Sequence, residues 1–171
     1  MTIAMSALPE KNEVFAAVAA YIQQQGFTVA SQDFNRPWGG FFVLQEADAP
    51  AFVEAYFPGY TAAQLTIGNK LSPKFLVVAP GMRLSWQYHH RRAEIWRVLQ
   101  NDVKVATSLT NDETTPKTYT AGQIVVLQKG ERHRLIGADT YGIVAEVWQH
   151  TDVLAPSDED DIVRLQDDFG R

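Results

Sequence analysis

Hydrophobic and polar positions follow two different periods along this chain. Over residues 9–25, apolar side chains such as Val14, Val18 and Ile22 recur every three or four positions, which is typical of one face of a helix. Gly26 follows at the place where helices commonly end. The pattern therefore predicts an N-terminal helix that packs against the outside of the remaining fold.

A second, shorter helix is expected over residues 49–57. Asp48 precedes this segment and is a suitable N-terminal cap, because its carboxylate can accept from backbone N–H groups of the first turn. Phe52 and Tyr56 lie four positions apart and are expected to pack inward on one face.

From about residue 70 the pattern changes to short apolar runs, separated by turn residues roughly every ten positions. Such runs without intervening helices favour an antiparallel sandwich or barrel. With two earlier runs, the expected strands are 27–30, 41–44, 74–79, 84–89, 94–99, 103–109, 117–119, 123–127, 133–136 and 143–148. We interpret 1–171 as one domain, with a barrel core at about 70–150, an N-terminal helical extension at 1–60 and a C-terminal segment at 151–171.

Composition narrows the range of functions. The net charge is −5 and no basic run exists, which argues against nucleic acid as a partner. The absence of cysteine excludes disulfides, thiolate metal sites and a cysteine nucleophile. No apolar run approaches the roughly 20 residues of a membrane helix, and the N-terminus lacks a signal-like pattern. We expect a cytoplasmic protein; a homodimer is an open alternative to a monomer.

The strand 84–89 and the run that begins at Glu94 carry the candidate chemistry. Strand side chains alternate between faces, so Ser85, Gln87 and His89 share one face. If the two strands are neighbours, Gln87, His89 and Glu94 converge. An imidazole, a carboxylate and an amide oxygen are a partial shell for a divalent metal. His133, at the start of a later strand, is the candidate for a further ligand.

The spacing of these residues resembles the two cupin motifs, as G-x5-Q-x-H-x4-E over residues 81–94 and G-x5-Q-x-G-x2-H over residues 122–133. Gln87 stands in place of the usual first histidine. That replacement, together with the ending at 159–171, resembles type II mannose-6-phosphate isomerases. The likeness is to the isomerase domain that is fused to GDP-mannose pyrophosphorylase, and it covers roughly residues 70–171, with a weaker echo at 36–39.

The resemblance implies an all-β fold, a cupin jelly-roll barrel with an added N-terminal helix. It implies one metal held by Gln87, His89, Glu94 and His133. Ligand softness suits zinc, which the resemblance also favours, while manganese, iron, cobalt and nickel stay open. The implied reaction interconverts mannose 6-phosphate and fructose 6-phosphate, so a small phosphorylated sugar is the expected partner.

Three basic residues match positions of the same family. Arg92 is implied as a site residue, because a guanidinium suits a phosphate or a developing enediolate. Lys74 is expected to approach the phosphate. Arg164 either binds substrate or pairs with Asp160 or Asp161 to fasten the C-terminal segment. The proton-shuttling base is expected to be a metal-bound hydroxide or an acidic residue of that segment.

Departures from the family pattern leave alternatives open. Ile95 replaces a family histidine, and Asn101 replaces the glycine that closes the first motif, where Asn tolerates a left-handed turn. If the missing histidine takes part in the reaction, the chain is a non-catalytic cupin that binds a sugar or sugar nucleotide. A third alternative is another cupin enzyme, such as an iron dioxygenase.

Overall fold

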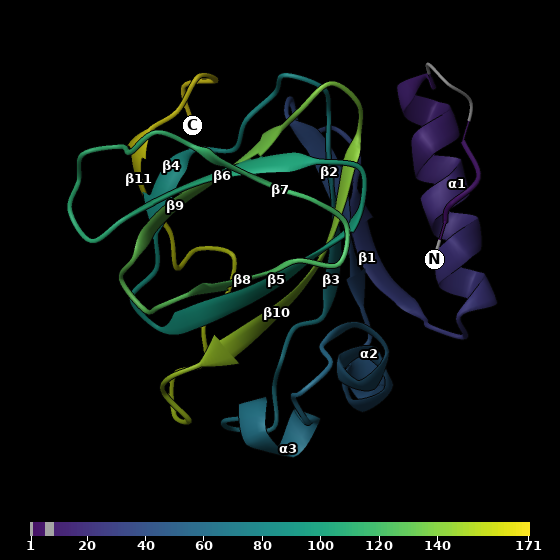
Figure 1. Cartoon of the computed structure of the whole chain (residues 1–171). Coiled ribbons are helices and arrows are strands. Elements are labelled where there is room, and N and C mark those ends of the chain that lie inside the picture. Colours follow the sequence, from purple (N-terminus) through teal and green to yellow (C-terminus); the bar gives the residue numbers. More distant parts are fainter. Residues whose placement is uncertain (1, 6–8) are drawn as a thin grey trace.

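The computed structural model describes residues 2–5 and 9–171, and its strands form two antiparallel sheets that face one another (Figure 1). Within these residues the larger sheet has six strands in the order β1-β2-β3-β10-β5-β8, and the smaller has five in the order β11-β4-β9-β6-β7. The strands are β1 (Val29–Asp33), β2 (Gly39–Leu44), β3 (Lys74–Val78), β4 (Trp86–Tyr88), β5 (Arg92–Gln100), β6 (Val103–Ser108), β7 (Lys117–Tyr119), β8 (Ile124–Leu127), β9 (Arg132–Gly137), β10 (Gly142–His150) and β11 (Val163–Gln166).

Helices cover the outer face of the larger sheet. They are α1 (Lys11–Gln24), α2 (Ala49–Tyr56) and the short α3 (Ala62–Leu65), with a 3-10 turn at Glu46–Asp48. Figure 1 shows α1 outside the barrel, beyond β1, and α2 and α3 at one end. The all-β fold with an added N-terminal helix is therefore confirmed. Residues 29–44 also add two strands to the larger sheet.

Two apolar cores result from the alternation of strand side chains. Phe75 and Val77 of β3 face outward, where they pack in one cluster with α1 and α2. Leu76 and Val78 of the same strand face inward and pack with apolar residues of the smaller sheet. Burial of both faces explains why β3 is apolar without interruption after its first residue.

Two local expectations have different outcomes. Asn101 has φ of 59°, so the left-handed turn between β5 and β6 is confirmed. The capping role of Asp48 was wrong, because its side chain makes no cap hydrogen bond to α2. Its carboxylate instead accepts from the backbone N–H of Thr28 at 2.7 Å, which ties the chain before β1 to the start of α2.

Candidate metal centre and cavity

The candidate ligands come from both sheets and meet inside the barrel. Gln87 on β4 lies opposite His133 on β9 in the smaller sheet, whereas Glu94 lies on β5 of the larger one. The strands of Gln87 and Glu94 are therefore not paired neighbours, which was the condition set for their convergence. The residues converge because the two sheets face each other, and Arg92 begins β5 and is not part of the connection before it.

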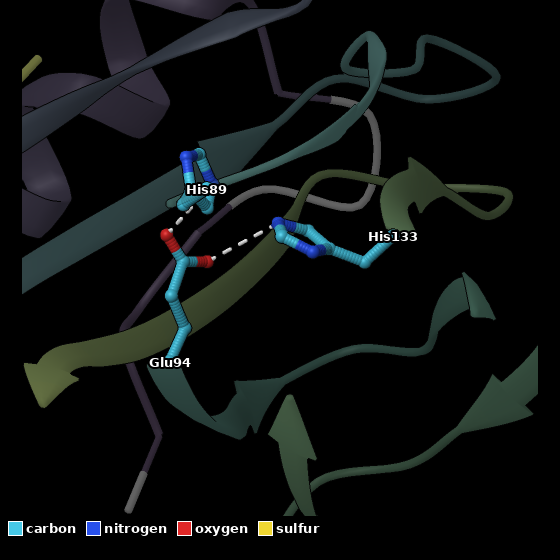
Figure 2. Close-up of side chains that lie close together, drawn as sticks. All are labelled: His89, Glu94 and His133. Carbon is cyan, nitrogen blue, oxygen red and sulfur yellow. Dashed lines mark ion pairs between the residues drawn. The ribbon is translucent and has the colours of Figure 1, made fainter. Parts of the chain in front are cut away.

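His89, Glu94 and His133 form a compact buried group (Figure 2). One ligand atom from each residue lies within 4.8 Å of the others. Glu94 Oε1 is 3.2 Å from His89 Nε2, and Glu94 Oε2 is 3.4 Å from His133 Nε2. The carboxylate thus presents one oxygen to each imidazole.

Backbone carbonyls fix the tautomer of both histidines. His89 Nδ1 lies 2.6 Å from the carbonyl oxygen of Asp161, and His133 Nδ1 lies 2.9 Å from that of Glu131. A carbonyl oxygen can only accept, so each Nδ1 carries the proton. In the neutral form of each ring, Nε2 then holds a lone pair on the side of Glu94, which is the arrangement that metal-binding histidines require.

Two buried acceptors of this group lack a hydrogen-bond partner among the described residues, namely Glu94 Oε2 and His133 Nε2. Two lone pairs that face each other at 3.4 Å repel, and a buried polar atom left without a partner is costly. A cation between them removes both penalties. The donor set of two imidazoles and a carboxylate therefore fits a divalent metal ion.

The protonation states of the cluster support this assignment. Burial alone would raise the pKa of Glu94, but the neighbouring His89 and the Arg92 guanidinium hold the pKa well below its usual value. Burial lowers the pKa of His89, against the opposing attraction of Glu94. An ionised carboxylate beside a neutral imidazole is the state in which both groups ligate metals.

Arg92 connects the cluster to the C-terminal segment. Its Nε donates to Glu94 Oε1 at 2.8 Å, its Nη1 donates to Ser157 Oγ at 2.8 Å, and its Nη2 lies 3.2 Å from His89 Nε2. The guanidinium carbon also lies 3.6 Å from the centre of a Trp148 ring. Arg92 is 4% exposed, so its contacts with the protein are protected from water.

The segment after β10 closes one side of the centre. Asp161 is buried, and its carboxylate accepts from the backbone N–H groups of His90 and Arg91 and from Ser157 Oγ. β11 then pairs with β4 beside Gln87. The acidic cluster at 158–161 thus contains one residue that organises the centre, Asp161. Its carboxylate is engaged by these donors, so no ion pair joins it to Arg164 in the described structure.

A cavity of about 350 Å³ opens next to the cluster. Gln87, Glu94 and Arg92 line its inner part, and Gln87 Oε1 accepts from Ser85 Oγ at 2.6 Å. Lys74 also lines the cavity, although it is buried and paired with Glu159. All seven residues chosen from the sequence lie at the cluster or its cavity. Among the residues that line the cavity are Arg36, Lys74, Gln87, Arg92, Glu94, Glu146, Trp148, Glu159, Arg164 and Arg171.

Sequence reasoning missed Glu146 and the two tryptophans that bind it. Glu146 lies on β10, and its carboxylate accepts from Trp148 Nε1 at 2.9 Å and from Trp96 Nε1 at 2.8 Å. The available signal was a single carboxylate within the apolar run 143–148, at the same strand parity as Trp148. A charge in such a run faces either solvent or a polar interior, and parity alone does not decide between them.

Comparison with known proteins identifies the family. A family model described as mannose-6-phosphate isomerase C-terminal matches residues 46–167. The chain belongs to this family. The alginate biosynthesis protein AlgA of Pseudomonas aeruginosa is 33% identical over 118 residues, which are 69% of this chain and 23% of that protein. The xanthan biosynthesis protein XanB of Xanthomonas campestris is 31% identical over 69% of this chain and 24% of its own length. This isomerase-family chain therefore spans about a quarter of the curated relatives that it matches.

Solved structures support the cupin fold of this isomerase-family domain. A recombinant oxalate oxidase in complex with glycolate covers 78% of the chain and 58% of its own length, with 20% identity and a TM-score of 0.51. The oxalate decarboxylase of Lactobacillus farciminis covers 79% of the chain and 33% of its own length, with 15% identity and a TM-score of 0.53. At these identities the likeness concerns the fold alone.

Position 95, where the resemblance to the isomerases implies a histidine, lies outside the cavity. Ile95 is 3% exposed and packs in the outer cluster with Leu99 and Val147, on the opposite face of β5 from Glu94. Its alternation with Glu94 and Trp96, which both line the cavity, explains this placement. A side chain at position 95 therefore contacts the core that holds α1 and α2.

Proposed function

We propose that this domain is a metal-dependent aldose–ketose isomerase that interconverts mannose 6-phosphate and fructose 6-phosphate. The observation that carries the proposal is that a cluster able to hold a metal ion adjoins a cavity that is also lined by arginines. His89, Glu94 and His133 offer metal ligands, and Arg164, which lies opposite Gln87 on the neighbouring strand, adds a positive charge to the same cavity. A phosphorylated sugar has matching chemistry, with hydroxyl or carbonyl oxygens at one end and a dianion at the other.

The residues that would hold the metal are Gln87, His89, Glu94 and His133. Zinc is the proposed ion, since two imidazoles with one carboxylate are common zinc donors. When bound, the ion would act as a Lewis acid that polarises the sugar oxygens and stabilises developing negative charge. Gln87 lines the same cavity as Glu94, and its amide oxygen, which accepts from Ser85 Oγ, is proposed as a donor to the metal or as a partner of a sugar hydroxyl.

The basic residues of the cavity are assigned to the anionic parts of the substrate. Arg92 orients Glu94, and its Nη2 side, which has the fewest protein partners, is proposed to contact the developing enediolate. Lys74 is proposed to approach the phosphate by exchanging its contact with Glu159, which is largely exposed. The remaining charge for the phosphate is assigned to Arg164.

Arg164→Ala is expected to weaken the binding of mannose 6-phosphate by about ten- to a hundred-fold, the effect of a charge-assisted hydrogen bond of about 1.5–3 kcal/mol. No hydrogen bond or ion pair joins the Arg164 side chain to a carboxylate among the described residues. Burial and the repulsion of Arg171 and Arg36 lower its pKa, against the attraction of Asp167 and Glu159, so an incoming anion relieves the net unfavourable environment. Calorimetric titration with mannose 6-phosphate and with unphosphorylated mannose measures the effect.

Lys117→Ala provides the matched control, because it removes one exposed positive charge on β7, away from the cavity. It should leave the affinity for mannose 6-phosphate unchanged within two- to three-fold. If Arg164→Ala binds mannose 6-phosphate as tightly as the parent does, Arg164 does not bind the phosphate.

A coupled assay tests the proposed function directly. The parent protein, stripped with a chelator and reloaded with zinc, manganese or cobalt, is given mannose 6-phosphate, and fructose 6-phosphate is detected. Metal-dependent turnover is expected. A complete lack of turnover with every metal would leave the non-catalytic alternative. The activity is proposed to be cytoplasmic, and none of the helices of residues 2–5 and 9–171 is long and apolar enough to span a membrane.

The second candidate function is a metal-containing cupin that binds a sugar or sugar nucleotide without converting it. Its main support was the replacement of a family histidine by Ile95. Because Ile95 packs in the outer core, this replacement does not remove a group from the cavity. The position therefore gives little reason to prefer the non-catalytic function.

Ile95→His is accordingly expected to give no gain in isomerase activity and to lower the free energy of unfolding by about 1–3 kcal/mol. The cost arises because the imidazole would be a buried polar group without a partner in an apolar cluster. Urea unfolding and the coupled assay measure the two quantities. A ten-fold increase in turnover would show instead that position 95 reaches the reaction site.

A further inference from the structure

Glu146 is a buried carboxylate that faces the cavity. It lies on the inner face of β10, is 4% exposed, and lines the same cavity as Gln87 and Glu94. Its two oxygens each accept one indole N–H, from Trp148 and from Trp96. An indole N–H can only donate, so these contacts fix the orientation of the carboxylate and leave the second lone pair of each oxygen without an indole donor.

The charged groups around Glu146 keep it able to exchange a proton near neutral pH. Burial raises the pKa of Glu146 to about 7, and the negative charge of Glu94 on β5 adds to this shift. Lys74 on β3 and Arg92 on β5 oppose it, while Glu159 of the C-terminal segment raises it slightly. The pKa of Glu94, by contrast, is held far below neutrality by its partners. Two carboxylates of one cavity thus differ in protonation, as an acid–base site and a ligand site require.

We propose that Glu146 is the general base of the isomerisation, which moves a proton between the two carbons that exchange the carbonyl group. This inference rests on the proposed isomerase function. The C2–H bond of the open-chain aldose breaks, the carboxylate of Glu146 takes the proton, and the electron pair forms the C1–C2 double bond of an enediolate. The Glu146 carboxylic acid then returns the proton to C1 as the C2 carbonyl forms. The O2 proton ends on O1, so C1 is reduced, C2 is oxidised and no outside redox partner is needed.

The other carboxylates of the cavity are less suited to this role. Glu94 accepts a hydrogen bond from Arg92 and faces the two histidines, so its lone pairs are directed to the guanidinium and to the proposed metal ion. Glu159 is exposed and paired with Lys74, and Asp160 is also exposed. A carboxylate in water is a weak base at neutral pH, whereas a buried one with its pKa near the working pH is effective. Of these four carboxylates only Glu94 and Glu146 are buried in the cavity wall, and Glu146 is the one that neither pairs with an arginine nor faces the histidines of the cluster.

Glu146→Gln tests the inference, because it keeps the size of the side chain and removes its basicity. With zinc content matched by elemental analysis, kcat is expected to fall by about 10²–10⁴-fold, while the dissociation constant for mannose 6-phosphate changes by less than about five-fold. Incorporation of deuterium from D2O into the sugar, followed by NMR, should fall in parallel. Infrared difference spectra should show a protonated carboxyl band in the parent that fades as the pH rises through about 7 and is absent from the variant.

Two further variants separate a base from a structural group. Glu146→Asp keeps a carboxylate, so its kcat should be lowered but should still fall as the pH is decreased, which is the acid limb of the kcat profile. Trp96→Phe removes one donor to the ionised form, so the acid limb of the kcat profile should move to higher pH. A Glu146→Gln protein that keeps kcat within ten-fold of an active parent overturns the inference. An inactive parent overturns the proposed function first, and the parent assay alone reveals that case.

Discussion

His133→Ala is expected to lower the zinc affinity of the domain by more than a hundred-fold and to leave its fold intact. His133 Nε2 is one of the two buried atoms of the cluster that lack a hydrogen-bond partner among the described residues, so the substitution deletes a proposed ligand. Loss of a group that only orients a ligand already costs about 10- to 100-fold in affinity, and loss of a ligand itself should exceed this. Within residues 2–5 and 9–171 the His133 side chain makes one hydrogen bond, to the carbonyl of Glu131, and one edge-to-face contact with Trp96, so the barrel loses few other contacts. Competition with a chromophoric chelator measures the affinity.

His90→Ala is the matched control for this experiment. His90 adjoins His89 in the sequence, but it is exposed and lies against Tyr88, away from the cluster. The variant removes one imidazole and should keep the parent affinity within about two-fold. Equal zinc affinity of the His133→Ala protein and the parent would contradict the assignment of His133 as a ligand.

Arg92→Ala is expected to have the largest effect on stability, a loss of about 3–5 kcal/mol in the free energy of unfolding of the metal-free protein. Removal of one partner from a buried ion pair leaves the other charge without compensation, and here that charge is Glu94. The substitution also deletes the donor to Ser157, which helps to hold the C-terminal segment. Urea unfolding in the presence of a chelator measures this loss without a contribution from bound metal.

Arg91→Ala tests whether burial of the Arg92–Glu94 ion pair is the cause of the expected loss of stability. Arg91 is the neighbouring arginine and is about one-third exposed; its shorter ion pair is with the exposed Asp158 at 3.1 Å, and it approaches the buried Asp161 only to 4.0 Å. Pairs of solvent-exposed groups contribute little to stability. Its unfolding curve should lie close to that of the parent. Arg92→Lys should recover only part of the loss, because an ammonium group cannot reproduce the spread of donors that reaches both Glu94 and Ser157. Equal stability of the Arg92→Ala and Arg91→Ala proteins would show that the buried pair is not stabilising.

The sequence predicted most of the strands because their residues alternate and their turns contain small or polar residues. The strand Lys117–Tyr119 has the expected bounds, and the turn at Asn101 has the expected left-handed backbone. Alternation also placed Gln87 and His89 on the inner side. It could not say which strands pair, because pairing depends on contacts between distant segments. Glu94 and Gln87 do line the same cavity, but they reach it from two facing sheets and not from adjacent strands.

The C-terminal segment was the least predictable part of the site. β11 has four residues, of which two are apolar, so the strand is too short for its alternation to be recognised in the sequence. The partners of Arg92 and His89 within this segment lie 65 and 72 positions away in the sequence, and no local pattern encodes such pairs. Glu146 was missed for a related reason, since its donors come from β5 as well as from its own strand.

The contact between His89 and Asp161 has a consequence for the order of assembly during synthesis. The two residues are 72 positions apart, and a ribosome that adds about 5–20 residues per second separates their synthesis by about 4–14 seconds. During that interval the nascent chain already contains Gln87, His89 and Glu94, but the carbonyl that selects the tautomer of His89 does not yet exist. The hydrogen-bonded environment of His89 is therefore completed only after Asp161 has been translated, when β4, β5, β9 and β10 have all been synthesised.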